Sequence, residues 1–280
     1  MNRTIAALSF ALLSPASLLG ASGCTQPPVN CTVSAAMPYT GKYKITAGQG
    51  SGACAELPGD ALGFGAYNRA TPEGVPDLDT VSMSVRTTFL GTLVAHAAEY
   101  GLRDPDDQNT PHAFGQFASG VPDADGICRP EELSVALQNV PAVAADPGDP
   151  DDPEDDIPEQ PATNVRETWT GVEVYVTAAN LGTQVRGQYS VAQDTCNAVY
   201  DVLALFPQVY CGDEDMIPDA DDDDDNEPDD TLCAAEAHPM LGIGSGISPD
   251  FPVTCDPDLL FCVLDAEPGS DTFPVLNPVE

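Results

Sequence analysis

The nine cysteines have the clearest chemical potential of any residue type in this sequence. An exported chain usually pairs its thiols, so an odd number leaves one cysteine to be explained. None has the C-x₂-C spacing typical of zinc sites, so disulfides are predicted instead of a metal centre. Eight are disulfide candidates: Cys31, Cys54, Cys128, Cys196, Cys211, Cys233, Cys255 and Cys262. Short loops around strand pairs favour Cys31 with Cys54 and Cys196 with Cys211, although the sequence alone does not fix the pairing.

The ninth cysteine, Cys24, follows a short apolar stretch and is predicted to carry lipid. Residues 5–19 are mostly apolar, a run too short to span a bilayer but typical of the central part of a secretory signal. Small residues at 20–23 followed by Cys24 resemble the lipobox of bacterial lipoproteins, in which the cysteine thiol receives a diacylglycerol. That pattern prefers leucine where Ala21 stands, and the alternative is an ordinary signal peptide. Thr25, in place of the aspartate of inner-membrane lipoproteins, indicates the outer membrane.

A third candidate chemistry is calcium binding by the stretch VPDADGICRPEE. It aligns with a twelve-residue calcium loop that has Asp123 at the third position, Asp125 at the fifth and Glu132 at the twelfth. An apolar residue at the first position and Arg129 at the ninth depart from that pattern. The alternative interpretation is an Asp-Gly turn between two strands.

Much of the acid is concentrated in two runs, 146–159 and 213–230. Neither run can bury apolar surface, so both are predicted to be solvated loops. In the second run Asp221, Asp223 and Asp225 are candidate calcium ligands, and no other cofactor is expected. The net charge of −36 argues against nucleic acid and against an anionic membrane surface as partners.

Catalytic motifs are absent from the sequence. His96, His112 and His238 form no recognisable metal or nucleophile motif, and the glycines around Ser245 have the wrong spacing for a nucleophile elbow. A non-enzymatic protein is therefore predicted, with a hydrolase assembled only by folding as an alternative. The low aromatic content of 6%, with Trp169 as the one tryptophan, argues against a carbohydrate reader.

Alternating apolar residues predict an all-β fold. In 168–177 Val172, Val174 and Val176 share one face, and Trp169 and Glu173 share the other. Together with the runs that follow it, this segment predicts an antiparallel meander. Fainter runs in the first half bring the total to about seven to nine strands, in a sandwich or an up-and-down barrel. The barrel interior is a candidate pocket for a small apolar ligand.

Two segments of the first half, 93–102 and 130–140, have patterns that fit a helix. A helix is expected at 93–102, with Gly101 at its end. The segment 130–140 fits either a helix or a strand.

Composition divides the chain into five parts. They are a signal peptide (1–23), a lipid-anchor tether (24–40), an antiparallel β domain (41–211) with an acidic loop at 146–161, a second acidic loop (212–231), and a Cys- and Pro-rich irregular segment (232–280) that packs on the β domain. The last part has little periodicity, so crosslinks are expected to hold it.

The lipobox, the eight further cysteines, the acidic loop, VYVTAANLGTQ, TCNAVYDVLALFPQVYC and GISPDFPVTCDPDLLFCVL resemble a group of lipoproteins from predatory, gliding bacteria. The resemblance implies export, lipid anchoring and disulfides, and it assigns no activity and no catalytic residues. The sequence thus predicts a cell-envelope lipoprotein with a binding or structural role and an unidentified protein or small-molecule ligand. A calcium-dependent surface or adhesion module is the alternative.

Overall fold

The fold was examined in a computed structural model. It describes residues 29–49, 53–102, 108–145, 159, 161–212, 227–239 and 241–278. Cys24 and the candidate calcium ligands Asp221, Asp223 and Asp225 lie outside the described residues. The helices and strands are β1 (Tyr39–Gln49), η1 (Ala53–Ala55), β2 (Gly59–Ala70), β3 (Pro76–Thr87), α1 (Thr88–Glu99), β4 (Ala113–Gln116), β5 (Ile127–Cys128), β6 (Ala136–Val140), β7 (Thr163–Val176), β8 (Leu181–Gln193), β9 (Cys196–Leu205), η3 (Asp230–Cys233), β10 (Val253–Asp256) and β11 (Phe261–Leu264).

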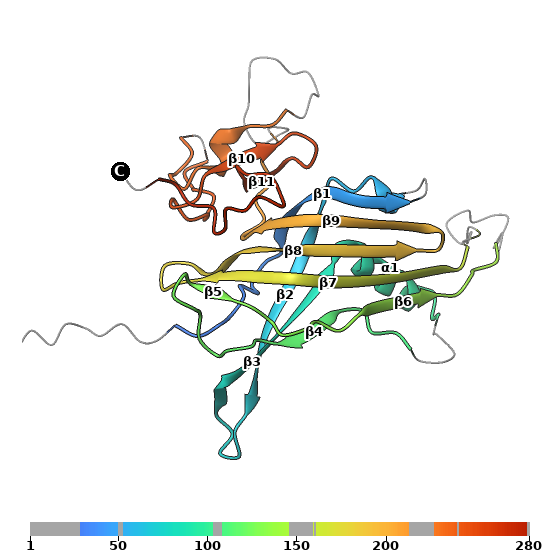
Figure 1. Cartoon of the computed structure of the whole chain (residues 1–280). Helices are drawn as coiled ribbons and strands as arrows, with labels where there is room; N and C mark the ends of the chain where they lie inside the picture. Colours follow the sequence, from blue (N-terminus) through green and yellow to red (C-terminus); the bar gives the residue numbers. More distant parts are fainter. Residues whose placement is uncertain are drawn as a thin grey trace, which may run out of the picture.

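One large antiparallel sheet forms the body of the protein (Figure 1). Its order is β4-β3-β2-β1-β9-β8-β7, and both β5 and β6 pair with β7. The first strand pairs with the last long one, with Thr40 opposite Leu205. The predicted meander is the run β7-β8-β9, in which each strand pairs with the next along the chain. The all-β prediction is therefore confirmed.

The sheet curls into a half-barrel, and backbone hydrogen bonds bring its two ends together. The segment 129–134, between β5 and β6, runs alongside β4. Three bonds join them: Ala118 N–H to Arg129 O (2.9 Å), Glu131 N–H to Gln116 O (2.9 Å) and Ser134 N–H to Phe114 O (2.8 Å). This closure favours the up-and-down barrel over the sandwich, because a sandwich would leave two separate sheets.

Buried side chains from the strands fill the concave side of the sheet. Tyr39, Leu62, Met83 and Tyr189 are at most 1% exposed and belong to one hydrophobic cluster. The interior that the sequence offered as a candidate apolar pocket is thus occupied by large side chains wherever the structure describes it. Such packing stabilises the fold at about 25 cal/mol for each Å² of apolar surface buried.

A β-bulge in β7 corrects the predicted face of Trp169. The pairing shifts between Thr170 and Glu173, so one extra residue lies on β7, and Gly171 there has a φ of +58°. The bulge turns Trp169 inward, where it is 3% exposed, onto the same side as Val172. Strict alternation had placed these two side chains on opposite faces, and that expectation was wrong.

The one long helix of the described chain begins earlier than its sequence pattern suggests. Thr87 caps α1 by accepting a hydrogen bond from Leu90 N–H at 3.1 Å, and Gly101 follows the helix with a φ of +62°. The helical expectation for 93–102 is confirmed in part, and the ambiguous segment 130–140 contains strand β6. None of the described helices combines the length and the apolar character that a membrane crossing requires.

All eight candidate cysteines form disulfides. The pairs are Cys31–Cys128, Cys54–Cys196, Cys211–Cys255 and Cys233–Cys262. The expected pairs Cys31–Cys54 and Cys196–Cys211 are wrong, because folding, not loop length, selects the partners. Cys31, for example, lies beside the segment before β5, where its N–H donates to Gly120 O at 2.8 Å.

The C-terminal segment, residues 227–278 as described, packs on β1, β8 and β9 (Figure 1). It has its own apolar cluster, which includes Leu203 and Leu205 of β9. Basic side chains of the sheet add polar contacts: Lys42 pairs with Asp256 at 3.1 Å, and Lys44 pairs with Glu267 at 3.5 Å. Two of the few basic residues thus form ion pairs between the sheet and the C-terminal segment.

Gln184 of β8 joins the C-terminal segment to the sheet through a pair of hydrogen bonds. Its Nε2 donates to Val275 O at 2.8 Å, and its Oε1 accepts from Val275 N–H at 3.0 Å. All of these groups are buried, so Gln184→Leu leaves a buried backbone N–H and C=O without partners. We expect a loss of about 2–3 kcal/mol in the free energy of unfolding and faster amide exchange at 270–278, measured by denaturation and hydrogen exchange.

The exposed Gln188 on the same strand offers the matched control. Gln188→Leu is expected to change the free energy of unfolding by less than about 0.5 kcal/mol. Equal losses for the two variants would contradict the role of Gln184.

Candidate ligand-binding site

Two open grooves on the surface differ in whether their charged groups are already paired. The larger, of about 470 Å³, lies between β7, β8 and β9 and the loop 269–271. Glu173 in this groove accepts hydrogen bonds from Arg186 at 2.6 Å and from Arg129 at 2.7 Å. Arg186 also donates to Ser270 O at 3.1 Å, and its guanidinium lies 4.8 Å from the ring centre of Phe273. These groups therefore hold the C-terminal segment in place.

The predicted calcium ligands Asp123 and Asp125 lie in a turn next to this network. Asp123 accepts hydrogen bonds from Asp125 N–H at 3.0 Å and from Ile127 N–H at 2.9 Å, and it pairs with Arg129 at 2.5 Å. The Ile127 hydrogen bond and then Arg129 lower the pKa of Asp123. Gly126 has a φ of +77°, as an Asp-Gly turn requires. Calcium binding here stays a prediction, and Arg129 stands beside the carboxylate that it would need.

The smaller groove, of about 270 Å³, opens on the convex side of β2 and β3, and we call it the outer-face pocket. Its residues are Gly63, Phe64, Gly65, Tyr67, Ser84, Arg86 and His112. Residues of β2 and β3 alternate between the two sides of the sheet, so inward Leu62 and Phe64 leave Gly63 and Gly65 facing outward. The missing side chains hollow this part of the surface.

Two exposed rings stand at one end of the outer-face pocket. Tyr67 is 53% exposed and Phe114 of β4 is 43% exposed, and their ring centres are 6.0 Å apart. The Tyr67 ring lies over Gly65, because a Cβ added at Gly65 would be 2.8 Å from the Tyr67 hydroxyl. Ser84 donates to that hydroxyl at 3.4 Å. Exposed rings beside hydroxyl groups provide both stacking and hydrogen bonds for a ligand.

The polar end of the pocket has groups without partners. Arg86 is exposed and has no acidic partner among the residues that the structure describes, in contrast to Lys42, Lys44 and Arg186. His112 makes no side-chain hydrogen bond within those same residues. Arg69 and Arg166 also have no acidic partner among the described residues, but Arg86 lines a groove, where its guanidinium is available to an anionic ligand.

The buried carboxylates form a separate cluster under α1. Glu167 is fully buried, and its Oε1 accepts from Thr87 Oγ1 at 2.7 Å and from the Tyr189 hydroxyl at 2.9 Å. Its Oε2 has no hydrogen-bond partner in the described structure. Burial raises the pKa of Glu167 to about 7 and that of nearby Asp60 to about 6. Large side chains surround these acids, so we treat the cluster as part of the core.

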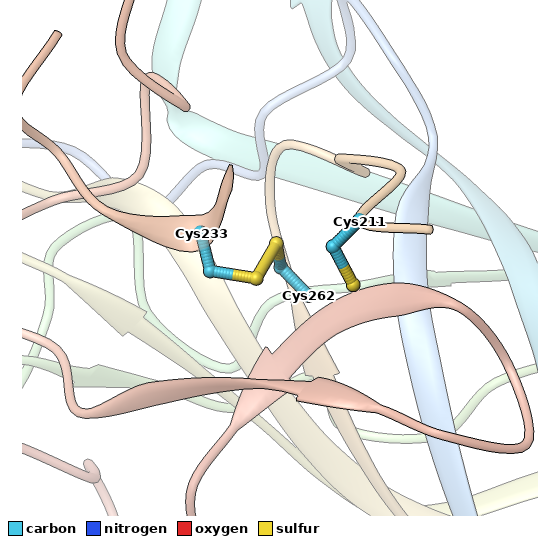
Figure 2. Close-up of side chains that lie close together, drawn as sticks. All are labelled: Cys211, Cys233 and Cys262. Atoms are coloured by element: carbon cyan, nitrogen blue, oxygen red, sulfur yellow. A yellow bond between two sulfur atoms is a disulfide. The ribbon is translucent and has the colours of Figure 1, made fainter. Parts of the chain in front are cut away.

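Three cysteines of the C-terminal segment lie close enough for a metal, but their sulfur atoms are already bonded. The sulfur atoms of Cys211, Cys233 and Cys262 are within 4.8 Å of one another. Figure 2 shows the Cys233–Cys262 disulfide with Cys211 beside it, and Cys211 is bonded to Cys255. A disulfide sulfur lacks the thiolate charge that zinc requires. The group is therefore a pair of neighbouring crosslinks.

Sequence reasoning missed most of the outer-face pocket. Its one available signal was the pair of glycines in ALGFGAYN, at alternate positions where a strand presents its outward face. Of the three histidines considered in the sequence, His112 lies in the pocket and His238 lies in the C-terminal segment. The buried Nε2 of His96 has no partner in the described residues, and its ring packs at 4.7 Å from that of Tyr100.

The fold defines a class: a disulfide-linked antiparallel β protein with a small open pocket on the outside of a curled sheet. The chain belongs to the MlpA family, whose model matches residues 37–207 and so includes the outer-face pocket. A Myxococcus xanthus protein named "Putative lipoprotein MlpA" is 24% identical over 269 residues, which cover 92% of each chain. This confirms the predicted resemblance. No solved structure matches the chain.

Proposed function

We propose that this protein is a lipid-anchored binding protein of the bacterial outer membrane, which holds a small ligand in the outer-face pocket without transforming it. The observation that carries the proposal is the unpaired Arg86 beside His112 and two exposed rings. The name of the M. xanthus relative and the signal-like N-terminus support the lipid anchor. The paired cysteines suit an oxidising compartment such as the periplasm.

Binding is favoured over hydrolysis by the composition of the pocket. Its residues include a serine and a histidine but no carboxylate that would orient His112 as a general base. The alternative of a calcium-dependent module depends on Asp123, which pairs with Arg129, on the exposed Asp125, and on acids that lie outside the described residues. Neither alternative has an observation of its own in its favour.

The anchor is tested by Cys24→Ala. Without the Cys24 thiol no diacylglycerol can be attached. A protein that lacks these acyl chains is held to a membrane only weakly and reversibly. We expect the wild type to sediment with membranes and to take up labelled fatty acid, and the variant to do neither. If the Cys24→Ala variant still sediments with membranes and still takes up labelled fatty acid, lipid attachment at Cys24 is contradicted.

The pocket is tested by Gly65→Val in the intact lipoprotein, purified in detergent micelles. The nearest neighbours of a Cβ at Gly65 are the end of the Tyr67 side chain and the Ser84 hydroxyl, both on the outer face, so the sheet is expected to fold normally while the pocket is filled. Ligand-detected NMR with hexoses, amino sugars, uronic acids and short peptides should find compounds that contact the wild type and not the variant. If every compound behaves alike with both proteins, the proposed function is wrong.

A further inference from the structure

The outer-face pocket also carries information about the chemical class of its ligand. We infer that it takes a sugar ring that bears one carboxylate, such as a uronic acid. This inference rests on the proposed function of the same pocket. It adds the shape of the ligand, its charge and the residue that binds the charged group.

The strand pairing around the pocket limits how an extended peptide can bind. An incoming strand needs free N–H and C=O groups at the edge of a sheet. β3 is paired with both β2 and β4, so it offers no free edge, whereas β2 is paired with β3 along the pocket and with β1 only at 59–62. A ligand in the pocket is therefore expected to contact side chains on the face of the sheet, and the small volume of the pocket favours a compact ligand.

The shape and the lining of the pocket fit a single sugar ring. A volume of about 270 Å³ is just below the roughly 300 Å³ at which ligand sites usually begin, so the pocket suits a ligand of one small ring. Tyr67 in the lining and Phe114 next to it offer apolar ring faces, while the Ser84 hydroxyl and His112 offer hydrogen bonds to ring hydroxyls. The low aromatic content of the chain argued against carbohydrate. The buried Trp169 agrees with that expectation, but two of the remaining rings are gathered and exposed at this one place.

Charge selects a carboxylate from among the possible anions. The planar guanidinium of Arg86 matches a carboxylate with two parallel hydrogen bonds. A phosphate would bring nearly two negative charges toward a protein of net charge −36, with one guanidinium in the pocket to balance them. A singly charged ligand meets less repulsion, so the favoured substituent is a carboxylate.

Three methyl glycosides that differ only at carbon six test the inference: methyl glucoside, methyl glucuronide and methyl glucoside 6-phosphate. Calorimetric titration of the intact lipoprotein in micelles should show the glucuronide binding at least ten times more tightly than the other two. Arg86→Gln should remove this advantage, because the guanidinium is lost. Arg166→Gln removes an exposed arginine of β7 that also has no acidic partner in the described structure, and it should leave the affinity unchanged.

The outcomes separate the ligand class from the proposed function. Equal binding of glucoside and glucuronide, with no effect of Arg86→Gln, overturns the carboxylate but leaves a Gly65-dependent sugar pocket. Tightest binding of the 6-phosphate overturns the carboxylate in favour of a phosphate. If none of the three sugars binds, the sugar assignment is wrong, and the proposed function falls with it only if the Gly65→Val comparison also shows no difference for any compound.

Discussion

Replacing Cys54 and Cys196 together by alanine is expected to lower the free energy of unfolding by about 4–5 kcal/mol. The two cysteines are 142 residues apart and join η1 to the start of β9. A crosslink that closes so long a loop removes many conformations from the unfolded chain, which is why its loss costs so much stability. Both side chains are buried, so alanine is the substitution that adds the fewest new contacts.

The matched control is the double variant Cys233→Ala and Cys262→Ala. That disulfide spans 29 residues, so its removal is expected to cost less, about 3.5 kcal/mol. Guanidinium denaturation at 25 °C, without reductant, measures both losses. If the Cys54 and Cys196 variant unfolds at the same denaturant concentration as the wild type, the long crosslink does not stabilise the protein as the structure indicates.

The second large effect is a dependence of stability on pH that comes from Glu167. Burial raises its pKa from 4.5 to about 7, so between these values the folded protein keeps a proton that the unfolded chain has lost. The stabilisation by this group is therefore complete below pH 4.5 and is lost as the pH rises through 7. The loss amounts to about 3 kcal/mol. Burial also raises the pKa of Asp60, to about 6, so this group adds a further loss of stability at a lower pH than Glu167.

Glu167→Gln isolates the contribution of this one carboxylate, because the amide stays neutral at every pH while Asp60 is retained. We expect the variant to gain about 3 kcal/mol relative to the wild type between pH 4.5 and pH 8. Denaturation at several pH values measures the gain. The exposed Glu132→Gln should show no such trend. If the difference between Glu167→Gln and the wild type is the same at pH 5 and pH 8, the buried acid does not titrate as described.

Short-range patterns were enough to predict the class of fold. Side chains that alternate in and out along a strand leave a period of two in the sequence, and the segments that became β8 and β9 show it plainly. The same rule failed at Trp169, because the bulge at Gly171 adds one residue and resets the alternation. Gly171 inside the strand pattern was the available signal of a bulge, but only the pairing of β7 with β8 fixed its position.

The sequence by itself determined the β-rich class, the eight paired cysteines and the predicted lipid attachment at Cys24, because these depend on composition and on neighbours along the chain. Only the tertiary structure decided the pairing of the cysteines, the burial of Glu167 and the pocket that brings Gly65, Arg86 and His112 together. Those features join residues from different strands, and their relative position is fixed by sheet register and curl. Local preferences do not encode such positions, which the free energy of the whole fold selects.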